Sequence, residues 1–143
     1  MRIGICTNSS SVFEIYNRHL DLDVVQIATN FLDMHSNLQL IREIKRSGVL
    51  VQARSVLSSG LLSGKYLPNK GVSFNDPLRK RFTENDKNRQ IVESRLSKLE
   101  LIREFYNVYL DRYEESNMSL SQFVYSSMDQ CPYIDNVLKG GQV

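Results

Sequence analysis

Short segments rich in β-branched residues alternate with amphipathic segments along most of this chain. We expect strands at Arg2–Thr7, Asp23–Ile27, Val49–Ala53 and Tyr133–Lys139. We expect helices from Ser11 to about His19, from Ser36 to Gly48, from about Asp86 to Tyr113 and from Ser119 to about Gln130. Strands separated by helices run parallel and are joined by right-handed crossovers. The sequence therefore predicts an α/β fold with a parallel sheet.

The helix ends are predicted from local signals. Three helices begin with capping-box spacing, a serine followed three residues later by Glu or Gln. These pairs are Ser11 with Glu14, Ser36 with Gln39, and Ser119 with Gln122. Gly48 stands where a left-handed residue commonly ends a helix. The long helix is predicted from an apolar face made by Val92, Leu96, Leu99, Ile102, Tyr106, Tyr109 and Tyr113.

The length of the chain limits the architecture. Its 143 residues suit one domain, residues 1–143, and a hydrophobic content of 41% is usual for a globular protein. A complete (β/α)8 barrel needs about 250 residues. Parallel β/α repeats of this length would suit a small doubly wound sheet as well as about half of such a barrel. Residues 67–85 are polar and contain two of the three prolines, so we expect an irregular segment there.

The segment after the third predicted strand, Ser55–Tyr66, is a turn rich in serine and glycine that closes with a lysine. Small residues let backbone N–H groups approach a ligand closely, and a lysine adds positive charge for a phosphate. These features indicate a phosphate-binding loop at the carboxyl edge of the sheet. A plain strand-to-helix turn is the alternative.

This loop resembles the one that follows the seventh strand of aldo-keto reductases, roughly S-x-L-x-x-G-x-L-S/T-G-K-Y. The matching residues are Ser55, Leu57, Gly60, Leu62, Ser63, Gly64, Lys65 and Tyr66. Arg2–Ile5 is similar to the fifth strand of that family, Asp23–Asp33 to the sixth, and Pro132–Gly140 to the eighth. The four segments occur in the family's order. The resemblance implies that the chain forms the carboxyl-terminal half of a (β/α)8 TIM barrel.

Aldo-keto reductases transfer a hydride between NAD(P)H and a carbonyl or alcohol. The resemblance implies that Gln26 holds the nicotinamide carboxamide and that the turn from Ser55 to Gly60 approaches the pyrophosphate. It implies a partial NADP or NAD site whose residues are Gln26, Ser55, Leu57, Gly60, Lys65 and Gly140. Backbone bonding at the end of a strand is the alternative for Gln26, and a solvated surface position is the alternative for Lys65.

Three positions differ from the family's pattern around the nicotinamide. Cys6 stands where a serine is usual, Asn8 lies one residue late, and Thr29 replaces the tyrosine that stacks on the ring. A threonine offers no flat apolar face for stacking. We therefore expect weak or absent cofactor binding by this chain alone.

The catalytic Asp, Tyr, Lys and His of the family come from its first four strands, and no segment here resembles that half. We expect His19 and His35 to be solvated, and we assign no catalytic residue. The expected function is that of a truncated aldo-keto reductase-like oxidoreductase domain, inactive alone, so whether the chain is an enzyme stays open. One alternative is a non-catalytic remnant that binds itself or a partner. Another is an independent small α/β binding domain.

Charge and cysteine usage exclude several other classes. The net charge is +2, and acidic residues dilute the basic tract at 79–98, so we expect no nucleic-acid partner. No Cys, His, Asp and Glu have metal-ligand spacing. Cys6 and Cys131 are expected to be reduced thiols. No leader pattern opens the chain and no apolar run reaches about 18 residues, so we expect a cytoplasmic protein without membrane contact.

An isolated half-barrel would leave two strands unpaired on one side, here Ile3–Thr7 and Ile134–Lys139. We also expect an uncovered apolar inner face that includes Val25, Val51 and Val137 or their neighbours. Unpaired strands recruit other chains. The expected partner is therefore a second copy, or a chain that supplies the missing half-barrel.

Overall fold

The computed structural model describes residues 2–65, 80, 84–113 and 117–140. The chain divides into two compact units. The first unit contains Met1–Ser58 and Val124–Val143, and the second contains Ser59–Phe123. Most of the segment predicted to be irregular, 67–85, lies outside the described residues.

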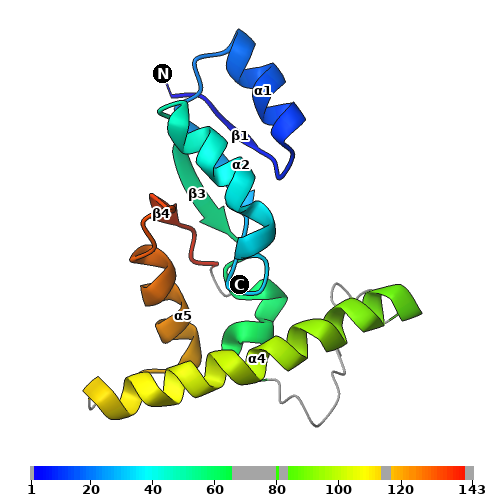
Figure 1. The fold of residues 1–143 in the computed structure, drawn as a ribbon, viewed down its shortest axis with the longest axis vertical. Helices are drawn as coiled ribbons and strands as arrows, with labels where there is room; N and C mark the ends of the chain where they lie inside the picture. Colours follow the sequence, from blue (N-terminus) through cyan, green and yellow to red (C-terminus); the bar gives the residue numbers. More distant parts are fainter. Residues whose placement is uncertain (1, 66–79, 81–83, 114–116, 141–143) are drawn as a thin grey trace. The chain divides into compact units, whose positions relative to one another are not determined.

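The first unit holds a four-stranded parallel sheet in the order β1-β2-β3-β4 (Figure 1). The strands are β1 (Gly4–Cys6), β2 (Val24–Ala28), β3 (Leu50–Arg54) and β4 (Asn136–Val137). They follow one another in space as they do in sequence, which confirms the predicted α/β class. The first and last strands are shorter than predicted, because only these residues pair with a neighbouring strand.

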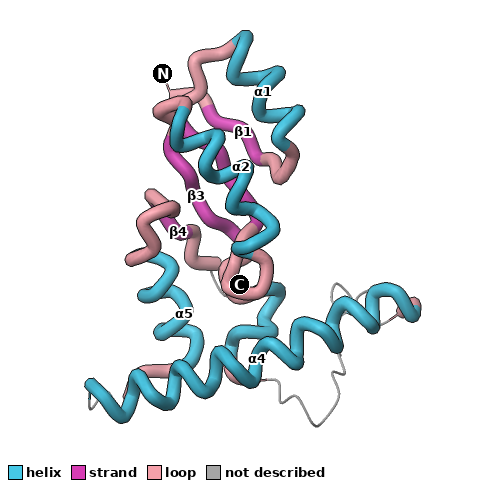
Figure 2. The backbone as a smooth tube through the Cα atoms, viewed as in Figure 1, coloured by secondary structure: helices cyan, strands magenta, loops and turns pink. Residues whose placement is uncertain are grey.

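Helices cover one face of this sheet, as Figure 2 shows for α1 (Ser10–His19) and α2 (Met34–Arg46). Helix α2 packs on β3, and α1 packs against α2. The buried helix residues are Phe13, Leu40, Ile41 and Ile44, and the fully buried strand residues are Val25, Ile27, Val51 and Ala53. Burial of each large aliphatic side chain contributes about 1.5–3 kcal/mol. This layer is the core of the first unit.

The opposite face of the sheet carries a row of polar side chains beside apolar residues such as Val24 and Leu50, and we call it the open face. Side chains alternate between the two faces of a strand, so residues that are partners in register share a face. Cys6, Gln26, Gln52 and Asn136 form one such row across the four strands. The predicted uncovered apolar face does not include Val25 and Val51, because both are fully buried on the helix-covered face, and Val137 shares their side. Their neighbour Leu50, which the prediction also allowed, is 41% exposed on the open face.

Two of the three predicted helix starts are also wrong. Helix α1 begins after Ser9, which is extended and whose side chain accepts a hydrogen bond from the Val12 N–H. Helix α2 begins after Asp33, before the predicted Ser36. The predicted end of α2 is confirmed, since Gly48 has a φ of 75°.

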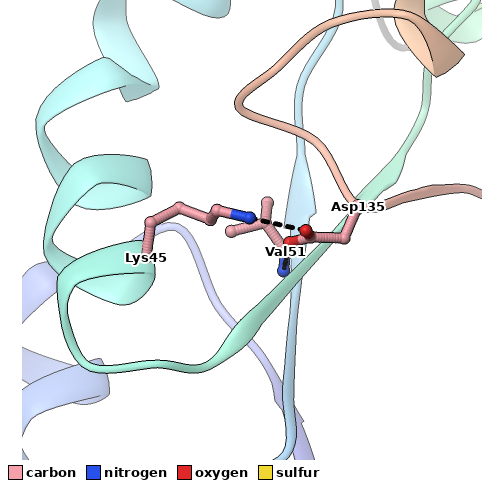
Figure 3. A network of polar contacts seen from close by, with 3 residues as sticks. All are labelled: Lys45, Val51 and Asp135. Carbon is pink, nitrogen blue, oxygen red and sulfur yellow. Dashed lines mark hydrogen bonds and ion pairs between the residues drawn. The ribbon is translucent and has the colours of Figure 1, made fainter.

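A polar cluster fixes β4 to β3 (Figure 3). One carboxylate oxygen of Asp135 accepts a hydrogen bond from the Val51 N–H at 2.8 Å. Its other oxygen pairs with Lys45 Nζ of α2 at 2.5 Å. Partial burial would raise the pKa of Asp135, but these bonds outweigh it and leave the pKa below its ordinary value. The charged carboxylate is therefore the form that joins the three elements.

The second unit contains the long helix α4 (Asp86–Tyr113), whose bounds match the prediction. Val92, Leu96 and Leu99 of its predicted apolar face are buried, whereas Tyr113 is exposed. Helix α5 (Leu120–Asp129) begins in this unit with the predicted capping box. Gln122 N–H donates to Ser119 Oγ at 3.2 Å, and Ser119 N–H donates to Gln122 Oε1 at 2.7 Å.

Candidate functional site

The open face carries amide side chains at the middle of the sheet. Gln26 Nε2 donates to Gln52 Oε1 at 3.1 Å, and both side chains are half-buried. Toward the carboxyl ends of the strands, Arg54 Nε donates to Cys6 Sγ at 3.1 Å. The arginine side chain therefore crosses β2 from β3 to β1. This part of the open face offers amide donors and acceptors together with one guanidinium group.

Asparagine side chains close the carboxyl edge of the sheet. Asn8 Oδ1 accepts from Ala28 N–H at 3.0 Å, and Asn8 Nδ2 donates to Ala28 O at 2.9 Å. The Asn8 amide thus continues the pairing of β1 with β2 beyond the last β1 residue. Asn30 is 2% exposed, and its Nδ2 donates to Ser55 O at 3.3 Å. Because their amides bond backbone groups of neighbouring segments, Asn8 and Asn30 hold the ends of β1, β2 and β3 together.

The loop after β3 has an unusual backbone. Ser55, Ser58, Ser59 and Gly60 have φ values of 58°, 49°, 57° and 95°. Such left-handed conformations cost a non-glycine residue about 1–3 kcal/mol and persist only where the surroundings impose them. Ser58 is also buried at 3% exposure, and among the described residues its hydroxyl has no hydrogen-bond partner. A buried hydroxyl without a partner is an uncommon feature of native proteins.

The predicted cofactor residues lie in both units. In the first unit Gln26 is on the open face, Ser55 and Leu57 are in the loop after β3, and Gly140 follows β4. Ser55 and Gly140 are exposed, and Leu57 is half-buried. A Cβ added at Gly140 would meet no atom within 4 Å, so no close approach within the chain requires glycine there.

Gly60 and Lys65 belong to the second unit. Lys65 is exposed and borders a hollow of about 520 Å³ that is also lined by Ser63, Gly64, Arg103, Tyr106, Asn107, Ser119 and Leu120. Arg103 Nη2 donates to Gly64 O at 3.5 Å. Lys65 and Arg103 thus border one hollow beside the start of α5.

Two residues that depart from the aldo-keto reductase pattern, Thr29 and Cys6, lie in different surroundings. Thr29 is fully buried, and its hydroxyl lies 3.9 Å from Met34 Sδ. It therefore presents no surface to the open face. Cys6 is exposed on the open face beside Arg54. His19 and His35 are both exposed.

Three features of the carboxyl edge were missed by the sequence reasoning. Gln52 and Arg54 lie two residues apart on one strand and so share the open face, a spacing that is readable in the sequence. No sequence pattern indicates that the Asn30 amide joins the ends of two strands, because this role depends on its contact with Ser55, which is distant in sequence. The burial of the Ser58 hydroxyl without a hydrogen-bond partner depends on the backbone torsions of the loop, which no local sequence pattern predicts.

No protein-family model matches the chain, and a search of the curated proteins finds no match. Within the described ranges, no three His, Cys, Asp or Glu residues gather to hold a metal ion. Among the helices described, none has the length and apolar character to cross a membrane.

Proposed function

We propose that this chain is an aldo-keto reductase-like half-barrel that carries part of an NAD(P) site and has no catalytic residues of its own. The parallel β/α order with helices on one face supports the half-barrel. The sequence resemblance in four ordered segments supports the family. Free Cys6 and Cys131 fit a cytoplasmic location.

The Ser58 hydroxyl carries the cofactor proposal. A buried polar group without a partner costs about 1–3 kcal/mol, and such groups in native proteins call for an explanation. An anion would be one explanation, because a turn with left-handed residues can direct free N–H groups toward an anion. The Ser58 N–H itself donates to Ser55 O at 2.8 Å, so these groups would come from the residues that follow it. In the first unit, Ser55 and Leu57 would hold the pyrophosphate, with Gly140 at its phosphates.

Gln26 would hold the nicotinamide end. Its bond to Gln52 uses one N–H of the amide and leaves Oε1 as an acceptor. That oxygen would accept from the carboxamide N–H of the nicotinamide. When bound, NAD(P)H supplies the hydride for carbonyl reduction. The residues of this chain orient the cofactor and contribute no proton donor.

Calorimetric titration with NADPH tests the proposal. We expect weak binding, and we expect Ser58→Ala to lower the affinity about tenfold, which corresponds to one hydrogen bond to a charged group. The variant should keep its folded stability, because the lost hydroxyl has no partner within the chain. Ser59→Ala is the matched control, with a similar φ of 57° but an exposed side chain. Absence of binding at millimolar NADPH, or equal losses in both variants, would overturn the proposal.

A further inference from the structure

We infer that the partner of the open face is a second copy of this chain, with β1 of each copy paired to β4 of the other. This inference rests on the proposed half-barrel fold. It assigns a specific occupant to two strand edges and one sheet face that no other described element of the first unit covers. The result is a two-fold symmetric barrel of eight parallel strands.

The first support is the outer edge of β1. Ile3 O accepts from Asp23 N–H at 2.8 Å, and Thr7 N–H donates to Gln26 O at 3.1 Å. Alternate residues of a strand direct their backbone groups to opposite sides. The N–H and C=O groups of Gly4 and Cys6 therefore point away from β2, where the sheet order places no strand. These groups form a free edge that can accept another strand.

The second support is the outer edge of β4. Asp135 N–H donates to Val51 O at 2.9 Å and Leu138 N–H donates to Ala53 O at 2.8 Å, so β4 is bound to β3 on one side. Its other side is the opposite end of the sheet. All four strands are parallel, so β1 of one copy meets β4 of another in the parallel sense. A two-fold axis makes this contact twice and leaves no free edge.

The third support is the chemistry of the open face. Parallel sheets are normally covered on both faces, and this face carries Gln26, Gln52 and Asn136 in one row. Amides both donate and accept hydrogen bonds, so this row is complementary to an identical row in a second copy. An apolar partner would leave the same amides without partners.

The fourth support lies at the amino edge of the open face. A hollow of about 400 Å³ is lined there by Arg2, Leu22, Asp23, Val24, Gly48, Leu50, Gln52 and Asn136. Leu50 is 41% exposed on this face. Its exposed apolar side chain, beside Val24 and Gln52, would be covered by a second layer of side chains. The arrangement fits the layered filling of a barrel interior.

Sedimentation velocity at micromolar concentration, without nucleotide, is the first test. We expect a dimer of the 16.5 kDa chain. Cys6→Pro should yield monomers, because proline removes the edge N–H while β1 keeps its bonds to β2. Cys6→Ser is the matched control and should remain dimeric, and circular dichroism checks that both variants fold. A folded wild-type monomer would overturn the inference.

Disulfide cross-linking is the second test and identifies the edges. In a Cys131→Ser background, a cysteine is placed in turn at Asn136, which lies on the open face, and at Leu138 and Gly140, which follow β4. At least one should form an intermolecular disulfide with natural Cys6. Val137→Cys, on the helix-covered face, should form none. A dimer that cross-links at none of the three positions, or a complex only with another protein, would refute the assigned pairing.

Neither measurement uses a cofactor, so both are independent of the nucleotide titration. A cross-linked dimer that fails to bind NADPH would overturn the proposed function alone. A monomer that binds NADPH through Ser58 would overturn the pairing alone.

Discussion

Asp135 shows how one carboxylate can join elements that are distant in sequence. It precedes β4, bonds the Val51 N–H of β3 and pairs with Lys45 of α2. Both contacts favour the charged carboxylate, so both weaken when Asp135 is protonated. The side chains of Lys45 and Asp135 are 35% and 23% exposed, so solvent weakens the pair but does not remove it.

Asp135→Asn should lower the free energy of unfolding by about 1 kcal/mol at neutral pH. The native pKa of Asp135 lies below its unfolded value, so the wild-type contribution is complete above about pH 4. It is lost as the pH falls through the native pKa, because the folded state must then bind the proton. Urea unfolding of both proteins from about pH 7 to pH 2 should show the difference shrink toward zero.

Asp129→Asn is the matched control for this measurement. Asp129 pairs with Lys139 at 3.8 Å, and both side chains are more exposed than those of Asp135 and Lys45. Its replacement should change stability by only a few tenths of a kcal/mol. Equal changes in the free energy of unfolding would show that the Asp135 ion pair contributes no more to stability than the exposed Asp129 pair.

At the scale of single elements, the three capping-box signals had different outcomes. Ser119 and Gln122 form the reciprocal bonds that the spacing predicts. At α1 the chain becomes helical after Ser9, so Ser11 lies in the first turn. The spacing of a capping box is short enough to recur by chance. The side chain that caps a helix is decided by where the backbone changes from extended to helical.

Ser119→Ala should lower the stability of the second unit by about 1 kcal/mol, because the Gln122 N–H loses its acceptor. Ser97→Ala on α4 is the matched control, since Ser97 Oγ only bonds the Ser94 carbonyl within the same helix. Hydrogen exchange of the α5 amides should rise in the first variant and stay unchanged in the second. Equal exchange in both would mean that Ser119 does not limit the fraying of α5.

For the sheet, the sequence predicted the strands and their parallel order, since both follow from local pattern and connection length. The assignment of faces failed because β-branched residues occur on both sides of a short apolar strand. Val25 is buried and Gln26 is on the open face, and only the helices above Val25 determine that choice. The loop torsions at Ser58 arise from contacts between segments, so the sequence placed the candidate site on a loop without showing its geometry.

At the scale of the whole molecule, the row of amides on the open face gives a new reason to expect that two copies of the chain associate. An apolar face would favour nonspecific aggregation. A row of amides between two free parallel edges favours a partner with matching hydrogen bonds instead. The expectation of self-association therefore depends on the edges of β1 and β4 and not on exposed Val25, Val51 or Val137.

The whole chain should show no carbonyl reductase activity. Reduction of a carbonyl needs a positioned proton donor, and general acid catalysis of this kind contributes about 10²–10⁴-fold. The segments of the sequence resemble only the half of the family's barrel that holds cofactor, and His19 and His35 are exposed. NADPH oxidation with a panel of aldehydes should therefore proceed at the rate without protein. Turnover that Gln26→Ala abolishes would contradict this expectation, because it would require a proton donor within the chain.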